Sequence, residues 1–190
     1  MKIVLAVLML TILLACQAPA DKIEYQTSEE GVLFSEDGDN ILFYQRAPKS
    51  FDGKYTRNNY VHPLWSLDGD TLTEDYPPDH AHHRGIFWTW HQIYVGDKSL
   101  GDAWECRDFM WDVTDIEVSD AAIGAKVLQA TVLWKSPDFV DDGGKMIPAV
   151  KENARIVIYP RVEDMRAIDF EIELLALQES VTIGGSKDRK

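Results

Sequence analysis

Residues 168–174 read Ile-Asp-Phe-Glu-Ile-Glu-Leu, with an apolar side chain at every even position and an acidic one at every odd position. Successive side chains of a β-strand point to opposite faces of a sheet, so this alternation predicts a strand with one buried face. The same period of two recurs in residues 154–158 and 128–134, and β-rich apolar runs lie between turn signals at residues 41–44 and 86–88. We therefore expect an all-β fold, an antiparallel β-sandwich, because strands of this kind bury their apolar faces against a second sheet.

Two stretches lack the strand pattern and are predicted to be loops, residues 47–59 and 65–83. Pro77-Pro78 stiffens the second one, since consecutive prolines favour an extended conformation. No part of the chain beyond the N-terminal segment shows a helical stripe of apolar residues. A long ordered loop in a compact domain is more often functional than accidental, which directs attention to residues 65–83.

The N-terminal residues are typical of a bacterial export signal. One charged residue precedes an apolar run that is too short to span a bilayer, and the run ends in Leu13-Leu14-Ala15-Cys16. This ending resembles the lipobox of bacterial lipoproteins, which predicts a signal peptide at residues 1–15, a lipidated Cys16 and a tether at residues 16–22. An ordinary signal peptide with a chance cysteine is the alternative. Gln17 replaces the aspartate that usually retains lipoproteins on the inner membrane, and so favours the outer membrane, facing the periplasm or the cell surface.

The remainder, residues 23–190, is expected to form one β-sandwich domain. It is long enough for a core of its own, and a chain with 45% hydrophobic and 11% aromatic residues has a globular composition. If Cys16 carries the lipid, Cys106 has no partner and the domain folds without an intramolecular disulfide. The net charge of -13 argues against nucleic acid or an anionic membrane surface as a partner.

All five histidines lie between positions 62 and 91, and three of them fall in residues 79–85, Asp-His-Ala-His-His-Arg-Gly. If this segment is extended, one side presents His80, His82 and Arg84, and the other presents Asp79 and His83. Two imidazoles that face the same way could share a metal ion or a proton-transfer task.

The metal interpretation requires neutral imidazoles and a further ligand. His80 and His82 would then bind a divalent metal together with a further ligand, which could be His62, His91, Asp79 or Glu74. A different interpretation makes the same side chains a buried hydrogen-bond network that ties the loop to the sandwich. The spacing alone does not choose between the two.

The third interpretation is acid/base chemistry. His80, His82 or His83 would transfer the proton, and Asp79 would orient an imidazole and favour its protonated form. Arg84 would hold an anionic or hydroxylated group of the substrate.

Five of the six tryptophans surround this cluster, at positions 65, 88, 90, 104 and 111. A sugar ring has apolar faces and polar edges, so indole stacking combined with hydrogen bonds from charged side chains suits it well. Trp88 and Trp90 alternate along a predicted strand and are expected in the core, with His91 beside them as a structural residue. The predicted ligand-binding residues are therefore His62, Trp65, Glu74, Asp75 and Trp104.

Several of these motifs resemble those of a known family. Residues 60–65 (Tyr-Val-His-Pro-Leu-Trp), 73–77 (Thr-Glu-Asp-Tyr-Pro) and 82–88 (His-His-Arg-Gly-Ile-Phe-Trp) resemble the signature of the secreted bacterial domains labelled methane oxygenase PmoA, and residues 101–104 and 152–155 also fit it. The resemblance implies a β-supersandwich like that of galactose mutarotases, which favours carbohydrates by analogy. Methane oxidation is not expected, because nothing after the signal can span a bilayer. Members of the family continue beyond the segment 184–186, so the resemblance also implies a truncated C-terminus.

Three functions follow from these observations. The first is an exported enzyme that acts on a small carbohydrate or polyol by histidine acid/base chemistry. The second is a non-catalytic sugar-binding lipoprotein that uses the same tryptophans. The third is a protein in which the histidines bind a metal ion. The sequence identifies no glycosidase carboxylate pair, so hydrolysis is not predicted.

Overall fold

The computed structural model of the chain describes residues 23–186. The predicted signal peptide, Cys16 and the tether lie outside these residues, as do residues 187–190. Strands dominate the described part, and its one helix is the short 3-10 turn η1, Ala122–Gly124. Within residues 23–186 no helix is long and apolar enough to cross a membrane.

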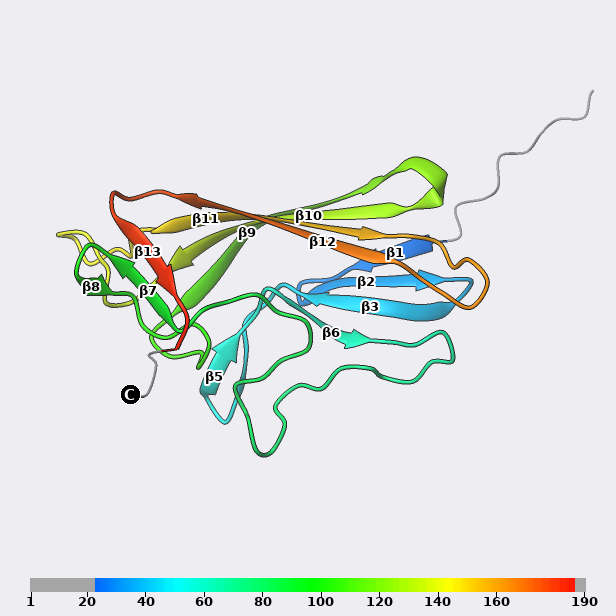
Figure 1. Cartoon of the computed structure of the whole chain (residues 1–190), viewed down its shortest axis with the longest axis horizontal. Coiled ribbons are helices and arrows are strands. Elements are labelled where there is room, and N and C mark those ends of the chain that lie inside the picture. The colour runs from blue at the N-terminus through cyan, green and yellow to red at the C-terminus, as the bar shows by residue number, and fades with distance from the viewer. Residues whose placement is uncertain (1–22, 187–190) are drawn as a thin grey trace, which may run out of the picture.

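Two four-stranded antiparallel sheets form the body of the domain. The first has the order β1-β2-β3-β6, with bounds Ile23–Thr27, Gly31–Glu36, Asp39–Gln45 and Tyr60–Leu64. The second has the order β12-β11-β10-β9, with bounds Ile168–Ala176, Val150–Ile158, Lys126–Lys135 and Met110–Asp120. The two sheets lie face to face (Figure 1), which confirms the predicted all-β antiparallel sandwich.

Two smaller sheets complete the domain. One has the order β13-β7-β8, with bounds Val181–Gly184, Gln92–Val95 and Lys98–Ser99, and lies at one end of the sandwich (Figure 1). The other is the hairpin β4-β5, with bounds Lys49–Phe51 and Lys54–Arg57.

The core lies between the two large sheets. Even-numbered residues of β10 point into it, and Leu128, Ala130, Val132 and Trp134 are at most 2% exposed. They belong to one cluster with buried side chains of β2 and β3, among them Phe34. The alternation in the sequence thus predicted β10, β11 and β12 correctly. The apolar run at residues 41–44 correctly predicted β3, in which Ile41 and Leu42 are both buried.

The strand predicted at residues 86–88 does not form. Ile86 makes only an isolated bridge to Val61, with both backbone hydrogen bonds at 2.9–3.0 Å. Gly85 crosses β6 so closely that a Cβ there would lie 1.9 Å from the Val61 carbonyl oxygen. The segment therefore touches the sheet at one point, and Trp88 and Trp90 pack on the core from irregular backbone. Their predicted core location is confirmed.

The predicted loop at residues 47–59 contains the hairpin β4-β5, so that prediction is wrong. Phe51 pairs with Lys54, which leaves Asp52-Gly53 as a two-residue turn, and both residues have positive φ, 50° and 72°. An Asp-Gly turn of this kind matches the twist of a hairpin and is a strong hairpin signal. The predicted loop at residues 65–83, in contrast, contains no named strand.

One inward-facing residue of β11 is a carboxylate. Glu152 is fully buried and accepts hydrogen bonds from Trp88 Nε1 (2.6 Å), Trp134 Nε1 (2.7 Å) and Asn59 Nδ2 (2.9 Å). The Tyr44 hydroxyl donates in turn to Asn59 Oδ1 at 2.7 Å. Burial raises the pKa of Glu152, and the three donors offset part of this rise. The network joins β3 and β11 to the two segments that carry Asn59 and Trp88.

Candidate functional site

The histidine segment turns instead of running straight. The His80 backbone N–H donates to the Pro77 carbonyl at 3.1 Å, and the His83 N–H donates to the His80 carbonyl at 2.8 Å. The predicted extended arrangement, with His80, His82 and Arg84 on one side, is therefore wrong. The turns instead bring the three imidazoles into contact, with ring centroids 4.8 Å apart for His80 and His83 and 4.5 Å apart for His82 and His83.

Arg84, the next residue after His83, is 2% exposed. Its guanidinium stacks on Phe87 and Trp111, and Nη1 donates to the His82 carbonyl and lies 3.2 Å from Cys106 Sγ. The predicted role of Arg84, to hold an anionic or hydroxylated group of the substrate, requires that group to reach this enclosed position. Burial raises the pKa of the Cys106 thiol despite the neighbouring charge of Arg84, so this free cysteine is a protonated thiol at neutral pH.

Asp75 anchors the loop that carries the histidines. Its carboxylate is 5% exposed, forms an ion pair with Arg57, lies 2.5 Å from Lys49 Nζ and accepts a hydrogen bond from the Tyr60 hydroxyl at 2.9 Å. The fully buried Arg57 also donates to the Ala81 carbonyl at 2.5 Å. Asp75, predicted as a ligand-binding residue, thus joins the hairpin β4-β5 to the loop that carries the histidine segment.

Charge and hydrogen bonding set the pKa of Asp75. Burial alone would raise it, but the hydrogen bond from Lys49 and the charge of Arg57 outweigh burial and hold the pKa below its usual range.

Burial lowers the pKa of His82, and the carboxylate of Glu105, 3.5 Å away, offsets this only in part. His82 is therefore neutral near pH 7.

Three other predicted residues lie apart from the imidazole cluster. His62 Nδ1 is 2.9 Å from Thr73 Oγ1, and burial lowers the pKa of this imidazole. Trp65 pairs with Thr71 through the backbone, and the side chain of Glu74 is exposed. The described part of the chain contains no group of three or more His, Cys, Asp or Glu side chains that could hold a metal ion. The predicted ligand set of His62, His80 and His82 is therefore not assembled.

Trp104 connects the imidazole cluster to a second feature. Its indole contacts His82 and His83 on one side, with centroid distances of 6.4 and 6.0 Å, and stacks on His91 at 5.4 Å on the other.

Asp79 stays at the outer edge, 79% exposed and 3.1 Å from His80 Nδ1. The hydrogen bond from His80 lowers the pKa of Asp79.

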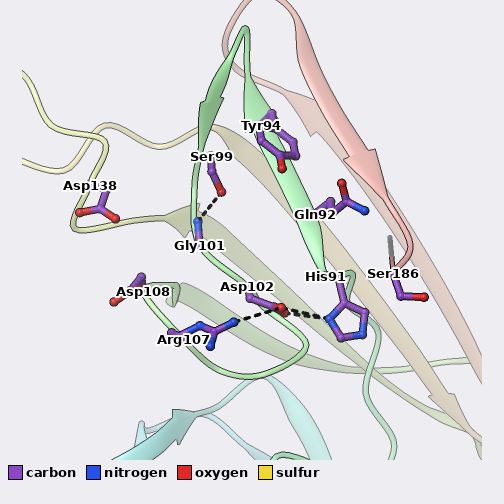
Figure 2. Close-up of a pocket in the computed structure, with 10 residues that line it drawn as sticks. All are labelled: His91, Gln92, Tyr94, Ser99, Gly101, Asp102, Arg107, Asp108, Asp138 and Ser186. Atoms are coloured by element: carbon purple, nitrogen blue, oxygen red, sulfur yellow. Dashed lines mark hydrogen bonds and ion pairs between the residues drawn. The ribbon is translucent and has the colours of Figure 1, made fainter. Parts of the chain in front are cut away.

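His91 and its neighbours line an open pocket of about 520 Å³ at the β7-β8 end of the domain (Figure 2). Asp102 lies against the imidazole, with Oδ2 3.1 Å and Oδ1 3.2 Å from His91 Nδ1, and Arg107 Nη2 is 3.6 Å from Asp102 Oδ2. The Glu105 backbone N–H also donates to Asp102 Oδ1 at 3.0 Å. These contacts fix the orientation of the ring.

Polar groups dominate the wall of this pocket. The amide of Gln92, the hydroxyls of Tyr94 and Ser99, and the carboxylates of Asp108 and Asp138 all line it. Such a mixture of donors and acceptors suits a hydroxylated ligand better than an apolar one.

Asp102 and Arg107 were not predicted as site residues, and His91 was predicted to be structural. The available signal was the Gly101-Asp102-Ala103-Trp104 motif. Gly101 has φ +95°, and a Cβ there would lie 2.5 Å from the Arg107 carbonyl oxygen. A glycine is therefore needed for the tight loop that brings Arg107 back to Asp102.

Fold and site together define an all-β sandwich protein with a polar pocket at one end, bordered by a cluster of histidines and one tryptophan. Residues 31–188 match the model of a family of unknown function, DUF6807, and the chain belongs to this family. The description of this family names no activity, and it does not contain the methane oxygenase label that the sequence motifs implied. Comparison with curated proteins and with solved structures gave no match.

Proposed function

We propose that the protein is an exported lipoprotein that binds a small carbohydrate or related polyol in the pocket at His91 and Asp102. The observation that carries this proposal is the His91 imidazole, which Asp102 holds at the wall of a polar pocket, with Trp104 stacked against it. An oriented ring nitrogen, carboxylates and an amide can bind adjacent hydroxyl groups in both senses, as donors and as acceptors. The resemblance of the motifs to a family with mutarotase-like members favours sugars by analogy.

The pocket predicts a specific loss of affinity. Asp102→Ala removes the acceptor that orients His91, and we expect it to weaken sugar binding on the order of tenfold to a hundredfold, as for loss of a hydrogen bond to a charged group. Calorimetric titration with a panel of mono- and disaccharides measures this. Asp115→Ala, an exposed carboxylate change on β9, is the matched control and should bind like the wild type. Equal affinity of both variants would exclude this pocket as the sugar site.

The second candidate function is an enzyme, and the His91–Asp102 pair favours it. A carboxylate that holds one imidazole nitrogen leaves the other nitrogen to exchange a proton with a substrate hydroxyl. His91→Gln keeps a hydrogen-bonding group of similar reach but cannot relay a proton. Proton NMR of the sugar measures its conversion. A His91→Gln variant that binds the sugar with wild-type affinity but no longer converts it would support the enzyme. A wild type that binds sugars without converting any of them would support the binding protein.

A further inference from the structure

An exposed apolar tip lies at the end of the sandwich away from the pocket. It consists of Ile123, Val162 and Met165, which are 80%, 67% and 67% exposed. Ile123 belongs to the turn between β9 and β10, and the other two pair with each other in the turn between β11 and β12. The two turns share the wall of an apolar groove of about 460 Å³.

The backbone of the tip is as unusual as its exposure. Ile123 has φ +56°, a conformation that β-branched residues rarely adopt. Its side chain therefore projects into solvent from a turn in which glycine or asparagine would be the ordinary residue. Neither this strain nor the exposure of three large apolar side chains serves the packing of the core, and exposed apolar groups gathered in this way mark a contact surface.

The domain begins beside this tip. Ile23, the first residue of β1, pairs with Glu36, and the Glu36 carboxylate accepts a hydrogen bond from the Arg161 backbone N–H at 3.1 Å and binds Arg166. Arg166 is itself part of the groove wall. Figure 1 shows the start of β1 at the same end as the β11–β12 turn. The tether of a lipid-anchored chain would therefore enter the domain at the apolar tip.

The length of that tether limits how far the tip can be from the membrane. Cys16 is seven positions before Ile23, so a fully extended connection spans at most about 25 Å. That is less than the thickness of a bilayer's hydrocarbon core, about 30 Å. A lipidated Cys16 thus keeps Ile23, and with it this end of the sandwich, near the lipid surface.

We propose that the apolar tip inserts into the headgroup and upper acyl region of the membrane that carries the Cys16 lipid. This inference rests on the lipoprotein part of the proposed function. Glu163 and Asp164, exposed at the turn between Val162 and Met165, would meet the ammonium groups of phosphatidylethanolamine. The net charge of -13 restricts the contact to lipid without net negative charge. Inserted in this way, the tip orients the pocket of β7 and β8 away from the membrane.

The test places a fluorophore on the tip of the full chain. Cys106→Ser removes the free thiol, and Met165→Cys adds one at the tip; a lipidated Cys16 has no thiol left to label. Leu175→Cys, at a side chain that is 54% exposed and at the end of β12 far from the tip, is the matched control. In vesicles of phosphatidylethanolamine and phosphatidylcholine we expect blue-shifted emission and quenching by brominated lipid from position 165, and neither from position 175.

The outcomes separate this inference from the proposed function. Equal emission from both positions on a chain whose Cys16 lipid is verified by mass spectrometry would overturn the membrane contact and leave the anchor in place. An unmodified Cys16 would overturn both the anchor and the contact, while sugar binding is measured independently. Self-association in solution that disappears in the Ile123→Ser, Val162→Ser, Met165→Ser triple variant would assign the tip to a second copy of the chain. Because all three side chains are exposed, this variant is expected to fold.

Discussion

Replacing Asp75 by alanine is expected to lower the free energy of unfolding by about 3–5 kcal/mol, the usual cost of leaving a buried ion without its partner. Arg57 is fully buried and would keep its charge, and the Tyr60 hydroxyl would lose its acceptor. Urea unfolding, followed by tryptophan fluorescence, measures the loss. Asp79→Ala provides the control in the same loop, because Asp79 is 79% exposed and its contact with His80 is in solvent. That variant should unfold at the same urea concentration as the wild type, since a solvent-exposed ion pair contributes little to stability.

The pKa of Asp75 also predicts how this stabilisation depends on pH. Its pKa in the folded protein is below the ordinary value of 3.8, so the unfolded chain binds a proton at higher pH than the folded one. The stabilisation is therefore present above about pH 4 and is lost as the pH falls through the folded pKa. The difference in stability between the wild type and Asp75→Asn should shrink in acid, and a difference that grew on acidification would contradict the ion pair.

Three adjacent strands of the second sheet were predictable from the sequence because their side chains alternate between a more buried and a more exposed face. Residues 128–134, 154–158 and 168–174 lie in β10, β11 and β12. The strand prediction was wrong at residues 86–88. Apolar side chains there pack on the core from irregular backbone, so the apolar run did not indicate a strand. The loop prediction was wrong at the hairpin β4-β5, whose Asp52-Gly53 turn carried the necessary signal.

The sequence located the histidine segment but did not predict the contacts within it. An extended segment would place His83 on the side opposite His80 and His82, whereas the His83 ring contacts both. Trp104 lies beside His82 and His83. The burial of Arg84 and Asp75 was not predictable from spacing, because it depends on Arg57 and on Trp111, which reach the loop from other strands. The His91–Asp102 pair was missed for the same reason, since a chain reversal through β7 and β8 brings the two side chains together.

Glu152→Ala is expected to lower the free energy of unfolding by about 4–5 kcal/mol, because it combines lost hydrogen bonds with a new cavity between the sheets. The change leaves the indole N–H groups of Trp88 and Trp134 and the amide of Asn59 without an acceptor. Glu152→Gln keeps the volume and one acceptor oxygen, but its NH₂ group faces donors, so we expect a smaller loss of about 1–3 kcal/mol. Urea unfolding of the three proteins tests the order. A Glu152→Ala variant as stable as Glu152→Gln would show that the network contributes little.

The same carboxylate has a pH dependence opposite to that of Asp75. Burial raises the folded pKa of Glu152 above 4.5, so the folded chain keeps the proton to higher pH than the unfolded one. Ionisation of Glu152 therefore lowers stability as the pH rises from about 4.5 through the folded pKa, and Glu152→Gln has no such step. The difference in unfolding free energy between the wild type and Glu152→Gln should therefore favour the wild type most in acid. The corresponding difference between the wild type and Asp75→Asn should favour the wild type most near neutral pH. Two unfolding series over the same pH range thus assign opposite slopes to two buried carboxylates, and slopes of the same sign would show that one of the two networks has been misjudged.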